Sequence, residues 1–384
     1  MSTLSISKTH TDVLILQALA QVDGLGSKTL WLLLNDAGSP TVLWEVSEDF
    51  LKARLSEAKV RVFLRRREEG FKSEDLERCE AQGIQVIPCT DALYSPLLKE
   101  IHNPPLLLYV QGNLEALSGK TLAVVGTRNA SEYGRQVTEK LIHDLQPAGV
   151  TIVSGLAAGI DTIAHWAALN EHLPTVAVFG CGLDVIFPRT NQRLSEEIVA
   201  QGGALVSEYP PGTPGSKYTY PQRNRIVAGL SHGVLVAEGD VRSGALITAR
   251  LALEEGRTVF AVPGNIFSPG SQGPLYLIKN GAAPVASAED LLRDLNWWLE
   301  PQQLSLGVQP GTETVPVASE MDNLSANLSE PEAQLLKSIP FDPVSVDSLP
   351  QACGLPSAGV NELLTLLELE GLIVLLPGAK VCRK

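Results

Sequence analysis

The chain has 384 residues, which suggests two or three domains at about 150 residues each. Apolar residues make up 44% of it and charged residues 19%, which is enough for at least one large core and excludes a largely disordered or collagen-like chain. Its 30 Lys and Arg against 43 Asp and Glu give a net charge of -13, which excludes a protein that coats nucleic acid over its whole surface. A polyanion would have to bind in one cleft that gathers positive charge, because salt screens distant acidic groups beyond about 8–10 Å.

The cysteines and the apolar runs indicate a cellular compartment. Five scattered cysteines form no CxxC pair and no Cys/His cluster with metal-ligand spacing, so we expect buried or incidental thiols in a reducing compartment and no metal site. No apolar run reaches the roughly 20 residues that span a bilayer, and the N-terminus lacks the pattern of a signal peptide. We therefore expect a cytoplasmic location.

The first region, residues 1–78, has a helical rhythm. Three segments place apolar residues three and four apart, at 11–22, 27–38 and 48–70. The Gly-Leu-Gly turn at residues 24–26 predicts a helix-hairpin-helix, or SAM-like, domain whose amides could face a phosphate backbone, although a packing turn explains it equally well. We interpret the basic run at residues 59–67 as a solvated helix face.

The second region, residues 79–298, alternates short β-branched runs with helical segments. Strands are predicted at 121–126, 151–155, 175–180, 204–209, 233–238 and 258–264, with shorter ones at 83–88 and 106–112. Helices are predicted at 134–146, 159–171, 189–201 and 244–256. This alternation indicates an α/β fold, an extended Rossmann-like, doubly wound parallel sheet with helices on both faces.

The last regions are a linker and a small domain. Residues 299–328 are polar and lack periodicity, which predicts a linker. Residues 329–384 open with a Ser-x-x-Glu capping box and continue as two short helices, a longer helix and a β-wing, which predicts a winged-helix-like domain. Its candidate recognition helix, 357–371, holds three Glu and no Lys or Arg, and the whole domain has seven acidic residues against four basic ones. Duplex DNA would be repelled, so we expect a protein-contact or regulatory role.

The loops after the first two strands of the parallel sheet could bind an anion. The first loop carries five candidate residues: Gly126, Thr127, Arg128, Ser131 and Tyr133. Amides at the start of the next helix and a guanidinium suit a phosphate, while Tyr133 could stack on a base. The alternative is a purely structural role, in which Gly126 only turns the chain and Arg128 pairs with a carboxylate. Gly155 follows the second strand, beside this loop in a doubly wound sheet.

The second loop also carries Asp161 and His165, four residues apart on one helix face. Acid–base chemistry is conceivable for such a pair, and a zinc site would need more ligands. We favour the interpretation that both residues orient the loop.

The later loops add cations and rings. Arg189 and Arg193 are four residues apart after the third strand. The loop at 207–231 then brings Lys217, Tyr220, Arg223, Asn224 and Arg225. Cations that follow a phosphate backbone and rings that stack on bases are typical of a sequence-tolerant single-strand binder. We interpret 236–265 as scaffold and crevice wall.

These runs together closely resemble the DprA (Smf, DNA-processing protein A) family over roughly residues 84–295. The resemblance implies a protein that binds single-stranded DNA and loads the RecA recombinase onto it in natural transformation, as a homodimer, with no cofactor and no enzymatic turnover. It equates Arg128 with the arginine of the family's glycine-turn motif, and Lys217 and 220–225 with its basic-aromatic loop. Tyr220 stands where many members have Phe, which keeps a ring for stacking.

Two other readings of the α/β region compete with this one. A nucleotide phosphoribohydrolase of the LOG type would carry a PGGxGTxxE run, and a dinucleotide-binding module would carry GxGxxG; the chain has neither. GxSxG, Walker A and HExxH motifs are also absent. The sequence favours a site that holds phosphate without breaking bonds.

Overall fold

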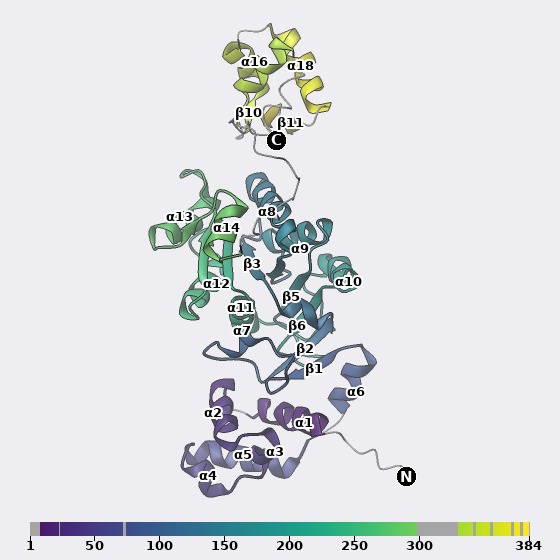
Figure 1. Cartoon of the computed structure of the whole chain (residues 1–384), viewed down its shortest axis with the longest axis vertical. Coiled ribbons are helices and arrows are strands. Elements are labelled where there is room, and N and C mark those ends of the chain that lie inside the picture. The colour runs from purple at the N-terminus through teal and green to yellow at the C-terminus, as the bar shows by residue number, and fades with distance from the viewer. Residues whose placement is uncertain are drawn as a thin grey trace, which may run out of the picture. The chain divides into compact units, whose positions relative to one another are not determined.

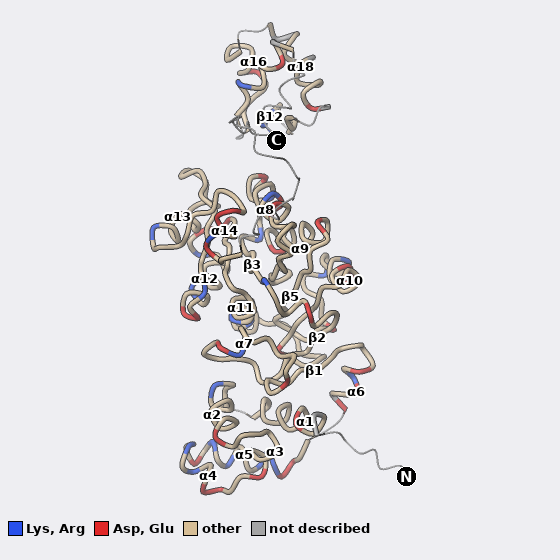
Figure 2. The backbone as a smooth tube through the Cα atoms, viewed as in Figure 1, with Lys and Arg blue, Asp and Glu red and all other residues tan. Residues whose placement is uncertain are grey.

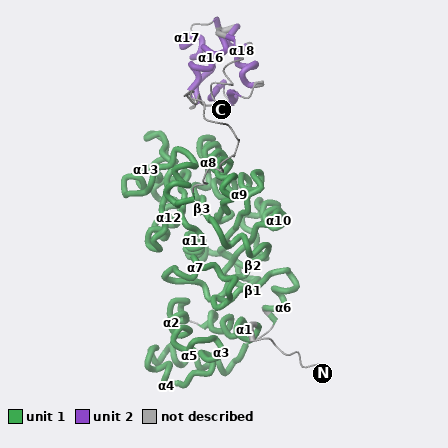
Figure 3. The backbone as a smooth tube through the Cα atoms, viewed as in Figure 1, with its two compact units in different colours: residues 1–302 green, residues 303–384 purple. Residues whose placement is uncertain are grey.

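The computed structural model describes residues 8–22, 24–71, 74–297, 329–340, 343–353, 356–369, 372–376 and 379–383. The chain divides into two compact units, residues 1–302 and 303–384, which are coloured separately in Figure 3. The linker predicted at 299–328 lies outside the described residues. Within the described residues, no helix is both long and apolar enough to cross a membrane.

The first unit begins with short helices. They are α1 (Lys8–Ala20), α2 (Ser27–Ala37), α3 (Pro40–Glu45), α4 (Glu48–Lys52), α5 (Glu57–Glu69) and α6 (Glu74–Ala81). The single helical segment predicted at 48–70 is two helices, because Ser47 caps α4 and a second start at Ser56 opens α5. Between α1 and α2, Gly24 adopts a φ of 77° and the buried Leu25 anchors the turn, so the hairpin also has a packing role.

The α/β part of this unit is one nine-stranded sheet. Its strands are β1 (Gln85–Pro88), β2 (Leu107–Gly112), β3 (Thr121–Gly126), β4 (Thr151–Ser154), β5 (Thr175–Phe179), β6 (Ala204–Ser207), β7 (Gly233–Glu238), β8 (Thr258–Ala261) and β9 (Ala283–Pro284). Their order is β1-β2-β6-β5-β4-β3-β7-β8-β9. The strands from β6 to β9 are parallel, and β1 and β2 extend the β6 edge antiparallel. All eight predicted strands are confirmed.

Helices cover both faces of the sheet. They are α7 (Pro96–Lys99), α8 (Glu132–Asp144), α9 (Ile160–Asn170), α10 (Gln192–Ala200), α11 (Thr219–Gly229), α12 (Gly244–Glu254), α13 (Gln272–Lys279) and α14 (Ala288–Asp294), with single 3-10 turns at 114–117, 146–148, 189–191 and 269–271. Figure 1 shows α8, α9 and α10 on one side of the sheet and α11 and α12 on the other.

Alternate residues along β3 enter two different cores. Leu122 and Val124 pack with α8 and α9, while Ala123 and Val125 pack with α11 and α12. The second of these cores continues without a break into α1, α2 and α5. The N-terminal helices therefore share their core with the sheet, and α6 spans the boundary predicted at 78/79.

Helix α11 corrects a prediction, because 207–231 was expected to be a loop. The Pro and Gly signals belong only to residues 210–215, and Pro221 lies in the first turn of α11, where a missing N–H costs nothing. The second half of α11 is buried from Ile226 to Gly229, so it shows no one-sided apolar pattern. Sequence periodicity is weak for a helix enclosed on several sides.

The second unit contains a small winged helix. Its elements are α16 (Glu330–Ser338), β10 (Val344–Ser345), the 3-10 turn at 346–348, α17 (Leu349–Cys353), α18 (Ser357–Leu369), β11 (Ile373–Leu376) and β12 (Lys380–Arg383). The strands form an antiparallel sheet in the order β10-β12-β11. The predicted capping box is confirmed, since the Ser329 amide donates to the Glu332 carboxylate at 2.7 Å. The predicted order of two short helices, a longer helix and a β-wing is also confirmed.

The five cysteines are free and buried, as predicted. Burial raises the pKa of the Cys89 thiol to about 12 and that of Cys181 to about 11. Both therefore stay protonated near neutral pH.

Candidate nucleic-acid interface

The candidate residues gather where the parallel strands end. β3 is flanked by β4 on one side and β7 on the other, so the chain order reverses around β3. In open α/β sheets the crevice at such a switch point is the usual ligand site. The candidate residues come from the end of β3 and from the turns and helices that follow β3, β4, β5 and β6.

The turn after β3 is held firmly to β7. Gly126 ends the strand, and the next amide, of Thr127, donates to the backbone oxygen of Glu238 at 2.8 Å. Ser131 caps α8 as predicted, since its Oγ accepts from the Gly134 amide at 3.1 Å. The Ser131 amide itself donates to Oε2 of Glu238 at 2.9 Å.

Arg128 projects from the middle of this turn. Its side chain is exposed, and among the described residues it forms neither a hydrogen bond nor an ion pair. The alternative in which Arg128 pairs with a carboxylate is therefore not observed in the described part of the chain. A solvent-facing guanidinium at a strand end is available for bidentate contact with a phosphate.

Tyr133 also lies at this edge, and its hydroxyl donates to the backbone oxygen of Pro263 at 2.5 Å. The ring is 45% exposed. The hydroxyl thus ties α8 to the turn after β8.

Helix α11 carries two arginines into the interior rather than onto the surface. Arg223 is 6% exposed and donates through Nη1 to the backbone oxygens of Gly155, at 2.7 Å, and Val178. Arg225 forms an ion pair with Glu208 at 2.5 Å, with both side chains largely buried. The expected basic loop is therefore smaller than the sequence suggests, because both guanidinium groups bind other parts of the protein. Asn224, between them, is half-buried.

Gly155 explains how Arg223 fits. A Cβ at this buried glycine would lie 2.5 Å from Nη2 of Arg223. The guanidinium therefore lies flat against the backbone after β4, which only glycine allows.

Tyr220 and Lys217 stay at the surface. Tyr220 is half-buried, with its ring against Gly180 and Gly215. Lys217 is exposed, and its Nζ lies 5.1 Å from the centre of the Tyr218 ring. The exposed ammonium group of Lys217 and the ring of Tyr218 therefore lie side by side where α11 begins.

The turn after β3 and the start of α11 meet in one site. Burial raises the pKa of the Tyr220 hydroxyl, and the positive charges of Arg223 and Arg128 oppose that shift. The turn after β4 lies between the two segments, since a Cβ at Gly159 would overlap the Thr127 backbone oxygen and a Cβ at Gly155 would lie 2.5 Å from Nη2 of Arg223 on α11.

Sequence reasoning missed Phe187. Its ring centre lies 5.6 Å from that of Tyr220, with the planes tilted by 38°, and it is 55% exposed. It offers more free ring surface than Tyr220 does. The available signal was an aromatic residue two positions before Arg189 in a loop already chosen for its cations.

Arg189 follows Phe187 by two residues, and Arg193 lies four residues further along the chain. Both are exposed, Arg189 in the 3-10 turn and Arg193 on α10, where it approaches Glu197 at 3.9 Å. Figure 2 shows basic and acidic residues interspersed over the first unit, so the positive charge here is local. That agrees with a binding cleft in an otherwise acidic protein.

Asp161 and His165 are structural, as predicted. Asp161 accepts hydrogen bonds from the amides of Gly155 at 3.1 Å and Ala157 at 3.4 Å, and burial raises its pKa. His165 bonds through Nδ1 to Thr175 at 2.7 Å, and burial lowers its pKa to about 3. Asp161 therefore holds the loop after β4, whereas the enclosed imidazole of His165 bonds to the start of β5 and does not exchange protons with a ligand near pH 7.

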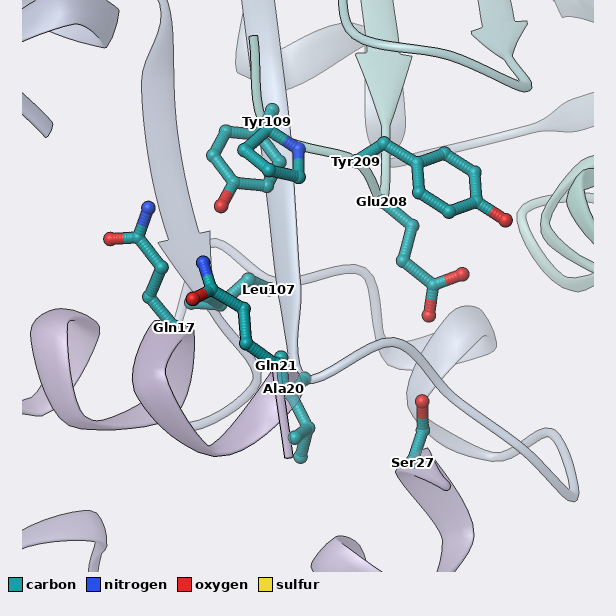
Figure 4. Close-up of a pocket in the computed structure, with 10 residues that line it drawn as sticks. Gln17, Ala20, Gln21, Ser27, Leu107, Tyr109, Glu208 and Tyr209 are labelled. Carbon is teal, nitrogen blue, oxygen red and sulfur yellow. The ribbon is translucent and has the colours of Figure 1, made fainter. Parts of the chain in front are cut away.

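A cleft of about 160 Å³ lies elsewhere in this unit, between α1, the start of α2, β2 and the end of β6 (Figure 4). Its lining has one carboxylate and no Lys or Arg: Gln17, Ala20, Gln21, Ser27, Leu106, Leu107, Tyr109, Glu208, Tyr209 and Pro210. Such a lining does not attract a polyanion. Among the described residues, no group of three His, Cys, Asp or Glu side chains could hold a metal ion.

Two family descriptions match the chain: DNA recombination-mediator protein A over residues 85–296, and the DprA winged helix domain over residues 319–379. Protein Smf of Escherichia coli (strain K12) is 42% identical over 305 residues, which are 79% of this chain and 78% of that protein. The X-ray structure of DNA processing protein A (DprA) from Streptococcus pneumoniae has a TM-score of 0.65 and 38% identity, and the match covers 76% of this chain and 99% of that one. A structure of DNA processing protein A from Helicobacter pylori, titled for that protein's single-stranded DNA binding mode, has a TM-score of 0.50 and 31% identity over 55% of this chain and 96% of that one.

The architecture and the site first define a class, an α/β protein whose sheet edge carries exposed cations and aromatic rings. A mostly parallel α/β sheet with exposed cations and rings at its carboxyl edge, followed by a winged helix, is matched here by the recombination-mediator description over more than half of the chain. With Smf and DprA relatives at 42% and 38% identity, the chain belongs to the DprA family.

Proposed function

We propose that this protein binds single-stranded DNA at the carboxyl edge of its sheet and loads the RecA recombinase onto that DNA in natural transformation. The observation that carries the proposal is that the turn bearing Arg128 and helix α11, which begins beside Lys217 and Tyr220, both pack against the glycines of the turn after β4. The Helicobacter relative, whose structure is titled for single-stranded DNA binding, supports the choice of ligand.

The exposed residues would contact the DNA, and the buried residues would hold them in position. Arg128, Arg189 and Lys217 would contact phosphates, while Phe187 and Tyr220 would stack on bases. Arg223 and Arg225, on either side of the half-buried Asn224, would hold α11 against β4, β5 and the end of β6 and so fix the position of Tyr220. Gly126, Thr127, Ser131, Tyr133 and Gly155 would shape the two turns.

Competition binding tests the choice of ligand. Purified protein is titrated with labelled oligo-dT, with unlabelled duplex as competitor, across a salt series. We expect oligo-dT to bind more tightly than duplex, with an affinity that falls as salt rises because phosphate contacts release counterions. Equal binding of both forms, or no binding, would contradict the proposal.

We also propose that the site performs no catalytic turnover. Asp161 is committed to backbone amides under the loop, and His165 is neutral and enclosed. Neither side chain is therefore available as an acid or a base for cleaving a glycosidic bond. Incubation with AMP should therefore release no adenine, and its release would favour the phosphoribohydrolase alternative.

A cytoplasmic location, RecA loading and homodimer formation complete the proposal, and the last two are separately testable in solution. RecA filament assembly on oligo-dT should be faster in the presence of the protein, since a loader supplies bound DNA to the recombinase. Light scattering should give the mass of a dimer at micromolar concentration. An unchanged RecA assembly rate, or a monomer mass, would remove the corresponding part of the proposal.

A further inference from the structure

Glu238, at the end of β7, contacts both ends of the Arg128 turn. Its side chain is 5% exposed. Its backbone oxygen accepts from the Thr127 amide at 2.8 Å, and its Oε2 accepts from the Ser131 amide at 2.9 Å. Residues 128–130 are therefore a three-residue span fastened at each end to one and the same residue.

Two glycines from different segments make room for this carboxylate. Cβ atoms added at Gly134, in the first turn of α8, or at Gly270, in the 3-10 turn before α13, would overlap the Glu238 carboxylate. The neighbouring Gly239 amide donates to the Gly270 backbone oxygen at 2.6 Å. The carboxylate thus lies in a closely fitted position between α8 and the turn before α13.

This position has a chemical meaning in the fold. The start of the helix after a strand at the switch point is where open α/β sheets bind a ligand's phosphate, because backbone amides and the positive end of the helix dipole point there. Here the Ser131 amide, at the start of the 13-residue α8, already faces a negative group that belongs to the protein.

We propose that Glu238 takes the place of a ligand's anion at the start of α8 and is the positioning residue that fixes Arg128 for the proposed DNA contact. It does not touch the DNA. It keeps the Arg128 turn in one conformation before binding, so less conformational freedom is lost when the guanidinium meets a phosphate. The same carboxylate closes the nucleotide-phosphate position of the fold.

A double-mutant cycle tests the positioning role and rests on the proposed function. Oligo-dT affinity is measured for wild type, Arg128→Ala, Glu238→Ala and the double variant. We expect Glu238→Ala to lose at least about threefold in affinity in the wild-type background and nothing further in the Arg128→Ala background, because coupled residues are not additive. The same loss in both backgrounds would overturn the proposal.

Two further variants separate positioning from folding. Lys217→Ala lies on another segment, so its effect should add to that of Glu238→Ala. Glu238→Gln keeps an oxygen that can accept from Ser131, so it should bind between wild type and Glu238→Ala, and if Glu238→Ala does not fold the cycle is read with Gln. Glu255 is the matched control, since its carboxylate also accepts from a backbone amide, that of His102, at 2.9 Å. Glu255→Ala should leave the coupling with Arg128 at zero, and a coupling equal to that of Glu238 would overturn the proposal.

A second measurement needs no DNA. Melting temperatures are recorded with inorganic phosphate and with sodium chloride at matched ionic strength. If Glu238 stands in for an anion, phosphate should stabilise Glu238→Ala by binding the vacated position, and should do so more than it stabilises wild type or Glu255→Ala, which keep this carboxylate. No phosphate effect on Glu238→Ala would overturn the proposal. If wild type fails to bind oligo-dT, the proposed function fails, and the phosphate measurement still decides the role of Glu238.

Discussion

The carboxyl edge of the sheet and helix α18 of the winged helix are the two regions most suited by fold to meet DNA, and they differ in charge. The edge exposes Arg128, Arg189 and Lys217 beside aromatic rings. Residues 357–371, which include α18, contain three Glu and no cation. Winged helices often insert such a helix into the major groove, but the chemistry for binding a polyanion lies on the sheet. The residues of a site, and not the function most often associated with a fold, therefore indicate what the site does.

The largest effect is expected from Arg128→Ala. Loss of one phosphate contact should weaken oligo-dT binding and flatten the log–log salt slope by about 0.7. Because the side chain has no protein partner among the described residues, the melting temperature should stay that of wild type. Arg61→Ala, which removes an exposed arginine of α5, is the matched control and should leave both affinity and slope unchanged.

If Arg128→Ala binds with unchanged affinity and slope, the edge of the sheet is not the interface. The winged helix would then become the better candidate for binding DNA.

The two rings should act by stacking. Alanine at Tyr220 or Phe187 should cost about 1–3 kcal/mol of binding free energy at every salt concentration and leave the slope alone, because stacking releases no counterions. Tyr220→Phe should bind oligo-dT with nearly wild-type affinity, because the ring remains. The alternative for Tyr220 is a packing residue against Gly180 and Gly215, which predicts a lower melting temperature for Tyr220→Ala.

Thermal denaturation therefore accompanies these titrations. Tyr276→Ala, which removes an exposed ring on α13, is the control for Phe187. A Phe187→Ala variant that melts and binds like wild type would remove this ring from the interface.

Lys217→Ala should have a smaller effect that depends on salt. Its ammonium group is exposed and lies on a flexible stem, so its contribution is mainly electrostatic. We expect the greatest loss of affinity at low salt and a shallower slope, and near-equality with wild type at high salt. A loss that is the same at all salt concentrations would indicate that Lys217 supports the conformation of the loop instead.

The smallest effect is expected from removing residues 329–384. If the acidic winged helix does not bind DNA, the truncated protein should bind oligo-dT nearly as well as the whole chain. Circular dichroism would show that the sheet is still folded. A large loss of affinity in a folded truncated protein would show that the winged helix takes part in binding despite its charge.

The strands and the edge they form were predictable because buried parallel strands are short apolar runs bounded by glycine. Arg128 and Lys217 were predictable as surface cations for the same reason, since each follows a recognisable strand end. The burial of Arg223 and Arg225 was not. Their partners at Gly155, Val178 and Glu208 come from three other segments, and no local pattern announces such contacts.

Glu238 shows the same limit. The sequence assigns it to the scaffold and the wall of the crevice and gives no sign of its contacts with the Arg128 turn. Its bond to Ser131 joins residues 107 positions apart, and the space for its carboxylate depends on glycines in two further segments. Local propensity predicts the elements, whereas the long-range contacts that hold a turn in place appear only once the sheet is assembled.

The burial of all five thiols has a practical consequence for following this protein by fluorescence. Maleimide dyes react with exposed thiolates, and Cys89 and Cys181, with pKa values raised to about 12 and about 11, remain enclosed and protonated at neutral pH. The natural chain is therefore an almost silent background for site-specific labelling. A single cysteine introduced at an exposed position beside the rings, such as Thr190, would carry one dye whose emission reports the arrival of a DNA strand.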